Sequence, residues 1–236
     1  MVTLMLLPGM DGTGLLLEPF VAALGQEFNV QVMRYPTDVP LDYAELEALC
    51  RAALPREEPF ILLGESFSGP IAVALAATHS PQLKGLILSC TFVRNPRPIF
   101  APLRTLVGLL PVSLAPMRVL CHLLLGRFSN PGLRALLEQA ITQVSPAALR
   151  ARLRAVLSVD VSVKLAAVKV PSLYLRATHD QVVPPSASAL IAKLSPHTQI
   201  VEMDGPHCLL QTNPSGAAQI VAAFIRQVQY LQGENP

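Results

Sequence analysis

Short apolar runs that alternate with amphipathic helical patterns constrain the fold of this chain more than any other feature. The expected strands cover residues 3–7, 29–35, 60–64, 85–90, 172–177 and 199–203, and the expected helices cover 18–24, 43–54, 67–78, 186–194 and 215–230. Strands that are separated by helices pair in parallel, and the helices cover both faces of the sheet. The pattern therefore predicts an α/β fold whose chemistry lies at the carboxyl ends of the strands.

Residues 92–169 interrupt this alternation. The stretch is rich in arginine, is punctuated by proline and contains no strand-like run. A chain of 236 residues fits one domain with an insertion, because single cores stop growing at roughly 250 to 300 residues. We therefore predict a helical cap, residues 92–169, inserted into a core made of residues 1–91 and 170–236.

Charge divides the chain along the same boundaries. The predicted cap carries nine Arg and two Lys against Glu138 and Asp160, a net charge of about +9, whereas the rest has seven basic and 14 acidic residues. Each arginine alone is consistent with a solvated helix face. Together they attract an anionic partner, such as an acyl carrier protein or an anionic lipid surface. The acidic core argues against nucleic acid.

Cysteine spacing and hydropathy indicate the cellular compartment of the protein. The four cysteines, Cys50, Cys90, Cys121 and Cys208, are scattered singly, which is typical of free thiols in a reducing compartment. The first residues lack the basic region of a signal peptide. The apolar run 105–126 is divided by Pro111 and Pro116 and would bury Arg118, so we expect two short helices there. These features predict a cytoplasmic protein.

The segment LLGESFSGP, residues 62–70, follows an expected strand and opens an expected helix. A nucleophilic serine on a sharp strand-to-helix turn needs small neighbours two positions away on either side. Gly64 fits, and Ser68 replaces the second glycine with another small residue. Ser66 is therefore the candidate nucleophile, and the alternative is an ordinary helix-capping serine.

A serine nucleophile needs a base, and the base needs an orienting acid. His207 follows the last expected strand, whereas His79, His122, His179 and His197 occupy positions typical of helix ends, packing or turns. For the acid, Asp180 follows the neighbouring strand in RATHDQVVPP, and Asp204 lies too close to His207 along the chain. Asp180 could instead cap the following helix.

The order Ser66, Asp180, His207 resembles that of the α/β-hydrolase fold family, of the serine esterase and lipase kind, over the whole chain. The resemblance implies a minimal, mostly parallel sheet of about six strands with an inserted cap. It also implies an oxyanion hole made of the Met10 and Phe67 amides, with Pro8 replacing the usual histidine of the loop LLPGMDGTG. The family's extra edge strands are missing, and the exposed edge could favour a homodimer.

No cofactor or metal is expected. The loop glycines Gly9, Gly12 and Gly14 have the wrong order for a dinucleotide site, and the next strand lacks an acidic residue for a ribose. Neither a Walker A motif nor H-E-x-x-H occurs, and no cysteine pair has metal-ligand spacing.

These features predict hydrolysis of small to medium aliphatic acyl esters through an acyl-enzyme. The apolar cap residues expected to hold an acyl chain are Leu106, Leu109, Leu110, Leu114, Met117, Leu120 and Leu124, although each could equally pack the cap onto the core. Transfer to an alcohol is the main alternative, because the loop PGMDGTG resembles that of plant phytyl ester synthase-type acyltransferases. An acyl-thioesterase and a non-catalytic ligand-binding relative are further alternatives.

Overall fold

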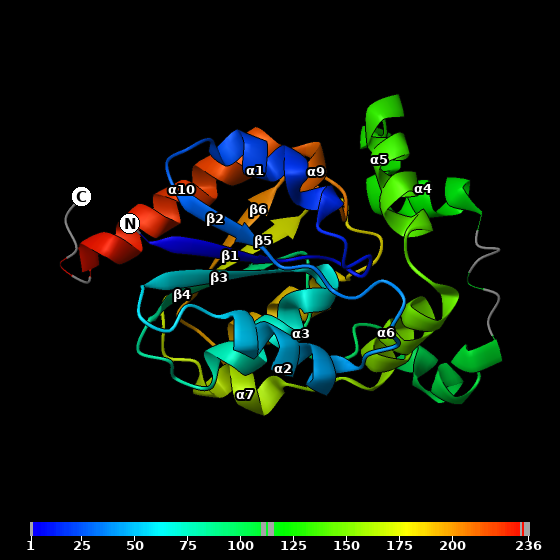
Figure 1. Ribbon diagram of the computed structural model, residues 1–236, viewed down its shortest axis with the longest axis horizontal. Helices are drawn as coiled ribbons and strands as arrows, with labels where there is room; N and C mark the ends of the chain where they lie inside the picture. Colours follow the sequence, from blue (N-terminus) through cyan, green and yellow to red (C-terminus); the bar gives the residue numbers. More distant parts are fainter. Residues whose placement is uncertain (1, 110–111, 113–115, 232, 234–236) are drawn as a thin grey trace.

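A computed structural model describes residues 2–109, 112, 116–231 and 233, and in them six parallel strands form one sheet in the order β2-β1-β3-β4-β5-β6 (Figure 1). The strands are β1 (Thr3–Leu7), β2 (Asn29–Val32), β3 (Phe60–Glu65), β4 (Leu83–Ser89), β5 (Ser172–Ala177) and β6 (Thr198–Met203). The predicted α/β fold with about six parallel strands is confirmed. The sheet edges are β2 and β6, and pairing of an edge with a second copy stays a prediction.

Strand boundaries agree with the sequence pattern to within one residue except at two places. The strand β2 ends at Val32, three residues before the predicted end at Tyr35. The chain leaves the sheet there because the Tyr35 amide bonds the carbonyl of Gly12, at 2.8 Å, and Pro36 offers no amide proton. The strand β4 begins at Leu83, two residues earlier than predicted.

Helices cover both faces of the sheet (Figure 1). One layer contains α1 (Glu18–Leu24), α9 (Leu209–Thr212) and α10 (Pro214–Leu231), and the other contains α2 (Tyr43–Ala53), α3 (Gly69–Ala76), α7 (Ser162–Ala167) and α8 (Pro185–Leu194). Every residue of β1 and β3 is buried, because two hydrophobic clusters lie on opposite sides of these strands. This is why the central strands read as continuous apolar runs.

The predicted cap is helical in its described residues. It contains η3 (Pro98–Thr105), η4 (Val107–Leu109), α4 (Met117–Leu125), η6 (Gly126–Phe128), α5 (Pro131–Thr142), α6 (Pro146–Ser158) and α7. Figure 1 shows α4, α5 and α6 beyond the carboxyl ends of the strands, whereas α7 lies beside α2 and α3. No helix in the described part of the chain is both long enough and apolar enough to cross a membrane. The division into core and cap stays a prediction.

The start of α3 lies unusually close to the segment after β4. A Cβ atom added to Gly69 would lie 2.5 Å from Cγ2 and 2.7 Å from Cβ of Thr91. The Thr91 hydroxyl donates a hydrogen bond to the carbonyl of Ser66, so Thr91 cannot move away without losing that bond. Close packing at Gly69 therefore fixes α3 behind the turn that carries Ser66.

We expect Gly69→Ala to lower the free energy of unfolding by about 1–3 kcal/mol, the typical result of overpacking. In an ordinary helix the same change is stabilising by up to about 1 kcal/mol. Urea denaturation of the full chain measures the difference. Gly132→Ala in α5 is the matched control, because its added Cβ would first meet Asn130 Oδ1 at an ordinary 3.4 Å. A Gly69→Ala protein as stable as the parent would contradict the close-packing argument.

Candidate active site

Ser66 lies on a strained turn between β3 and α3, in the 3-10 helix η2 (Ser66–Ser68). Its φ of 48° is in the left-handed region, which residues other than glycine seldom adopt. A Cβ added to Gly64 would lie 2.7 Å from the Ala72 Cβ and 2.9 Å from the Ser68 carbonyl oxygen. The turn therefore requires a glycine two residues before Ser66, as the sequence indicated.

A hydrogen-bonded relay joins Ser66, His207 and Asp180. The Ser66 Oγ lies 2.7 Å from the His207 Nε2, and the His207 Nδ1 lies 2.8 Å and 3.0 Å from the two carboxylate oxygens of Asp180. If Nδ1 carries the proton that Asp180 accepts, Nε2 is free to accept the proton of the Ser66 hydroxyl. The structure thus brings together three residues from the ends of β3, β5 and β6.

The Asp180 carboxylate is buried and held in place by the backbone. Its Oδ1 accepts hydrogen bonds from the amides of Val182 and Val183, each at 2.8 Å. The helix α8 begins only at Pro185, so these bonds stabilise the turn and do not cap the helix. The rival carboxylate, Asp204, is 66% exposed and contacts Arg127 and His179 instead.

The remaining histidines lie elsewhere. His79 is exposed just after α3, and His122 is exposed on α4. His179 lies 3.1 Å from the Asp204 carboxylate at the surface, and the His197 Nε2 lies 3.2 Å from the Ser195 Oγ. His207, by contrast, is 5% exposed.

The residue that departs from the expected glycine, Ser68, ties the turn to the loop that carries Met10. Its hydroxyl donates to the Pro8 carbonyl oxygen, and it accepts the hydroxyl proton of Tyr35 at 2.6 Å, because its own proton is already used. A glycine could make neither bond.

Phe67 lies in the first turn of η2, where a backbone amide has no carbonyl partner within the helix.

Arg152 of α6 is a residue that sequence reasoning missed. Its side chain is completely buried, and its guanidinium donates to the carbonyl oxygens of Met10 at 2.8 Å, Asp11 at 2.7 Å and Pro36 at 2.8 Å. It also lies 5.8 Å from the centre of the Tyr35 ring. Burial lowers the pKa of Arg152, and the charge of Asp11 opposes this effect. One arginine from the predicted cap thus holds the Met10 loop.

Glu65 is a second missed residue and directly precedes Ser66. It is buried and accepts a hydrogen bond from the Gln211 side-chain amide at 2.9 Å. Burial raises the pKa of Glu65 to about 7; the Gln211 bond opposes this rise, the charge of Asp11 adds to it, and the charge of His207 opposes it. The position of Glu65 in the motif does not reveal its burial or its raised pKa, because the residues that surround it come from distant segments of the chain.

Part of the predicted acyl-binding surface of the cap packs against a cluster that includes Cys208, the residue after His207. Met117 and Leu124 pack against a cluster that includes Cys121 and Cys208, and the Cys208 amide donates to the Leu124 carbonyl at 3.0 Å. The four cysteines are all buried and unpaired. Leu110 and Leu114 lie outside the described residues, as does the side chain of Leu109.

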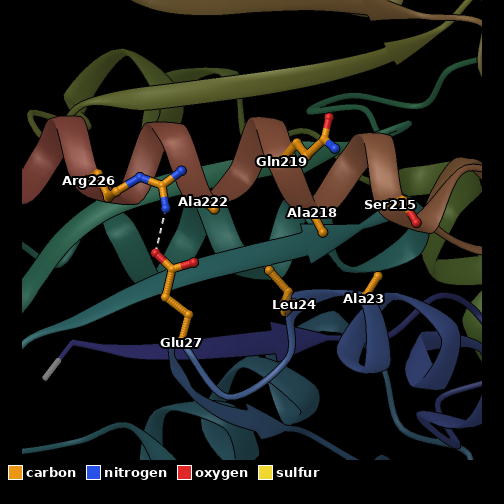
Figure 2. Close-up of a pocket in the computed structure, with 8 residues that line it drawn as sticks. All are labelled: Ala23, Leu24, Glu27, Ser215, Ala218, Gln219, Ala222 and Arg226. Carbon is orange, nitrogen blue, oxygen red and sulfur yellow. Dashed lines mark hydrogen bonds and ion pairs between the residues drawn. The ribbon is translucent and has the colours of Figure 1, made fainter.

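Two surface grooves are lined by residues other than those of the relay. A groove of about 210 Å³ between α1 and α10 is closed at one end by the ion pair of Arg226 with Glu27, at 2.5 Å (Figure 2). A larger groove of about 720 Å³ lies between α4 and α5 and is lined by Arg118, His122 and Arg134, among others. Neither groove is lined by a relay residue. In the described part of the chain, no three His, Cys, Asp or Glu side chains cluster to hold a metal.

Several known proteins are similar to this chain. Phytyl ester synthase 1, a chloroplastic protein of Arabidopsis thaliana, is 35% identical over 124 residues, which are 48% of this chain but 17% of the plant protein. Pyrrolizixenacetamide deacetylase of Xenorhabdus hominickii is 21% identical over 189 residues, 77% of this chain and 70% of that protein. The chain therefore spans only about a sixth of the plant protein's length.

The structure of a thermophilic esterase from Thermogutta terrifontis superimposes with a TM-score of 0.78 at 23% identity, and covers 97% of this chain and 90% of the esterase. This likeness shows a shared α/β-hydrolase fold. The family model described as serine aminopeptidase, S33, matches residues 36–210, well over half of the chain. The protein is therefore a member of the serine aminopeptidase S33 family of α/β-hydrolases.

Proposed function

We propose that the protein hydrolyses aliphatic carboxylic esters through an acyl-enzyme on Ser66. The observation that carries the proposal is the relay, in which the Ser66 Oγ lies 2.7 Å from a His207 ring that is held by a buried carboxylate. This is the arrangement that turns a weakly nucleophilic hydroxyl into a strong nucleophile. The fold likeness to an esterase supports the same reaction class.

In the proposed mechanism, the Ser66 Oγ attacks the ester carbonyl while the His207 Nε2 takes its proton. Asp180 holds the ring and stabilises the imidazolium that forms. The amides of Met10 and Phe67 donate to the oxyanion of the tetrahedral intermediate. The intermediate expels the alcohol, which receives the proton from His207. A water molecule then attacks the acyl-enzyme with the same general base, and the acid is released.

Transfer of the acyl group to an alcohol is a second candidate function. The identity with phytyl ester synthase 1, at 35% over 124 residues, favours it. The two functions share the acyl-enzyme and differ only in the acceptor. Incubation with an activated acyl ester and a long-chain alcohol separates them, because hydrolysis yields free acid whereas transfer yields a new ester.

An ester is favoured over a peptide despite the name of the family. The cap side chains that pack against the cluster containing Cys208, such as Met117 and Leu124, are apolar and offer no charge to hold a peptide terminus. Comparison of p-nitrophenyl esters with aminoacyl anilides of the same acyl size tests this preference.

Ser66→Ala should lower kcat toward a p-nitrophenyl ester by about a million-fold, because the acyl-enzyme cannot form. A fluorophosphonate probe should label the parent protein and leave the variant unlabelled. The matched control is Ser215→Ala, which removes an exposed serine from the groove shown in Figure 2. Full activity of Ser66→Ala, or a loss with Ser215→Ala, would contradict the assignment.

Arg152 is a positioning residue in this proposal, because it fixes the carbonyl of Met10 and not the substrate. We expect Arg152→Met to lower kcat by about 10²- to 10³-fold, the effect of losing one oxyanion donor, with a much smaller change in KM. Arg152→Lys should restore part of the loss, because a lysine retains the charge and can bond one carbonyl.

Active-site titration normalises these rates to the folded fraction, and a thermal melt reports stability separately. Arg154→Met is the matched control, because Arg154 is exposed on the same helix. If Arg152→Met lowers the melting temperature but leaves kcat per titrated site unchanged, Arg152 has a structural role only.

Glu65, the residue before the proposed nucleophile, makes the free energy of unfolding depend on pH. Its pKa is about 7 in the folded protein, above its ordinary value of 4.5, so the folded state binds more protons between these pH values. The free energy of unfolding therefore falls as pH rises through this window. Glu65→Gln removes the titration and still accepts the Gln211 bond.

We expect the stability of Glu65→Gln relative to the parent protein to rise by up to about 3 kcal/mol between pH 4.5 and pH 7, and to stay constant above. Urea denaturation at each pH measures it. The control is Glu57→Gln, an exposed carboxyl after α2. Parallel stability curves for Glu65→Gln and the parent would contradict the buried titration.

A further inference from the structure

Exposed apolar side chains are concentrated on η3, in the predicted cap. Phe100, Leu103 and Leu106 are 47%, 47% and 51% exposed, and Ile99 beside them is 82% exposed. A 3-10 helix has three residues per turn, so side chains three positions apart lie one above the other. Phe100 and Leu103 in η3 therefore form one apolar stripe with Leu106, the residue just after the helix.

This stripe is not part of a hydrophobic core. Although η3 contacts α6, none of the four side chains belongs to a hydrophobic cluster of the described residues. Folding alone does not explain four exposed large apolar residues within eight positions, because they lower the solubility of the chain and add nothing to its core. A contiguous apolar patch of this kind marks a surface that binds something.

Two basic residues lie near the stripe. Arg104 is exposed within η3, and the Arg154 guanidinium lies close to Gly108 in η4, 3.3 Å from where a Cβ atom would stand. Residues 92–137 contain no Asp or Glu at all. An apolar stripe with a positive rim complements an anionic lipid surface, in which the arginines meet the headgroups and the side chains enter the acyl boundary.

We propose that the η3 stripe, Phe100, Leu103 and Leu106, docks the protein on an anionic lipid bilayer together with the neighbouring Ile99 and Arg104. The side chains are exposed and line neither of the two grooves described above, which suits a bilayer better than a folded partner of fixed shape. The helix η3 lies against α6 at the end of the molecule that faces away from the termini (Figure 1). Docking would turn the carboxyl ends of the strands, where Ser66 lies, toward the membrane. The docking does not depend on the proposed hydrolysis.

Co-sedimentation of the full chain with vesicles tests the proposal. We expect binding to vesicles of equal phosphatidylglycerol and phosphatidylcholine, and little binding to pure phosphatidylcholine. The double change Ile99→Asp with Leu103→Asp should lower the partition coefficient at least about tenfold. Arg104→Gln should lower it about fivefold, and binding should weaken as salt rises above about 0.1 M.

Two exposed residues on elements other than η3 provide matched controls. Val163→Asp changes an 86% exposed side chain on α7, and Arg56→Gln removes an exposed charge from the segment after α2. Both should bind vesicles like the parent protein, and so should Ser66→Ala, which separates docking from the proposed chemistry. The proposal is overturned by equal binding to neutral vesicles, by unchanged binding of the double variant, or by binding to an acidic carrier protein without vesicle binding.

Discussion

The parallel pairing of β1 with β3 is the constraint on which the rest of the structure depends. Its register sets Leu7 beside Gly64, so the loop after β1 and the turn after β3 start at the same level of the sheet. Ser68 can then bond Pro8, and the amides proposed for the oxyanion hole share one edge. On the other side of the sheet, the register of Ala177 with Met203 brings the segments that carry Asp180 and His207 to that same edge.

Much of this arrangement could be predicted because it is encoded locally. Apolar runs between Gly and Pro define strands that are buried on both faces, and the bounds of β1 and β5 agree with their pattern residue for residue. The turn at Ser66 needs a glycine at position 64 for steric reasons that act within a few residues. Asp180 and His207 follow from their places after neighbouring strands, because parallel strands deliver their carboxyl ends to one edge.

The features that sequence reasoning missed depend on contacts between distant segments. Arg152 meets the carbonyl of Met10 across 142 positions, and nothing distinguishes it in the sequence from Arg154, an exposed arginine of the same helix. The net charge of residues 92–169 includes Arg152, although its buried guanidinium adds nothing to the charge of the surface. Glu65 likewise meets Gln211 across 146 positions. The early end of β2 follows from a bond between the Tyr35 amide and Gly12, which no local preference reveals.

The anchoring of the Met10 loop by a helix of the predicted cap limits how the two parts can be recombined. Three carbonyl oxygens from two separate loops converge on one guanidinium. A chimaera that borrows a foreign cap without an arginine at the position of Arg152 would leave these acceptors buried and unsatisfied. An exchange of the predicted cap within this fold should therefore retain an arginine at the position of Arg152, which makes α6 the segment that such a graft has to preserve.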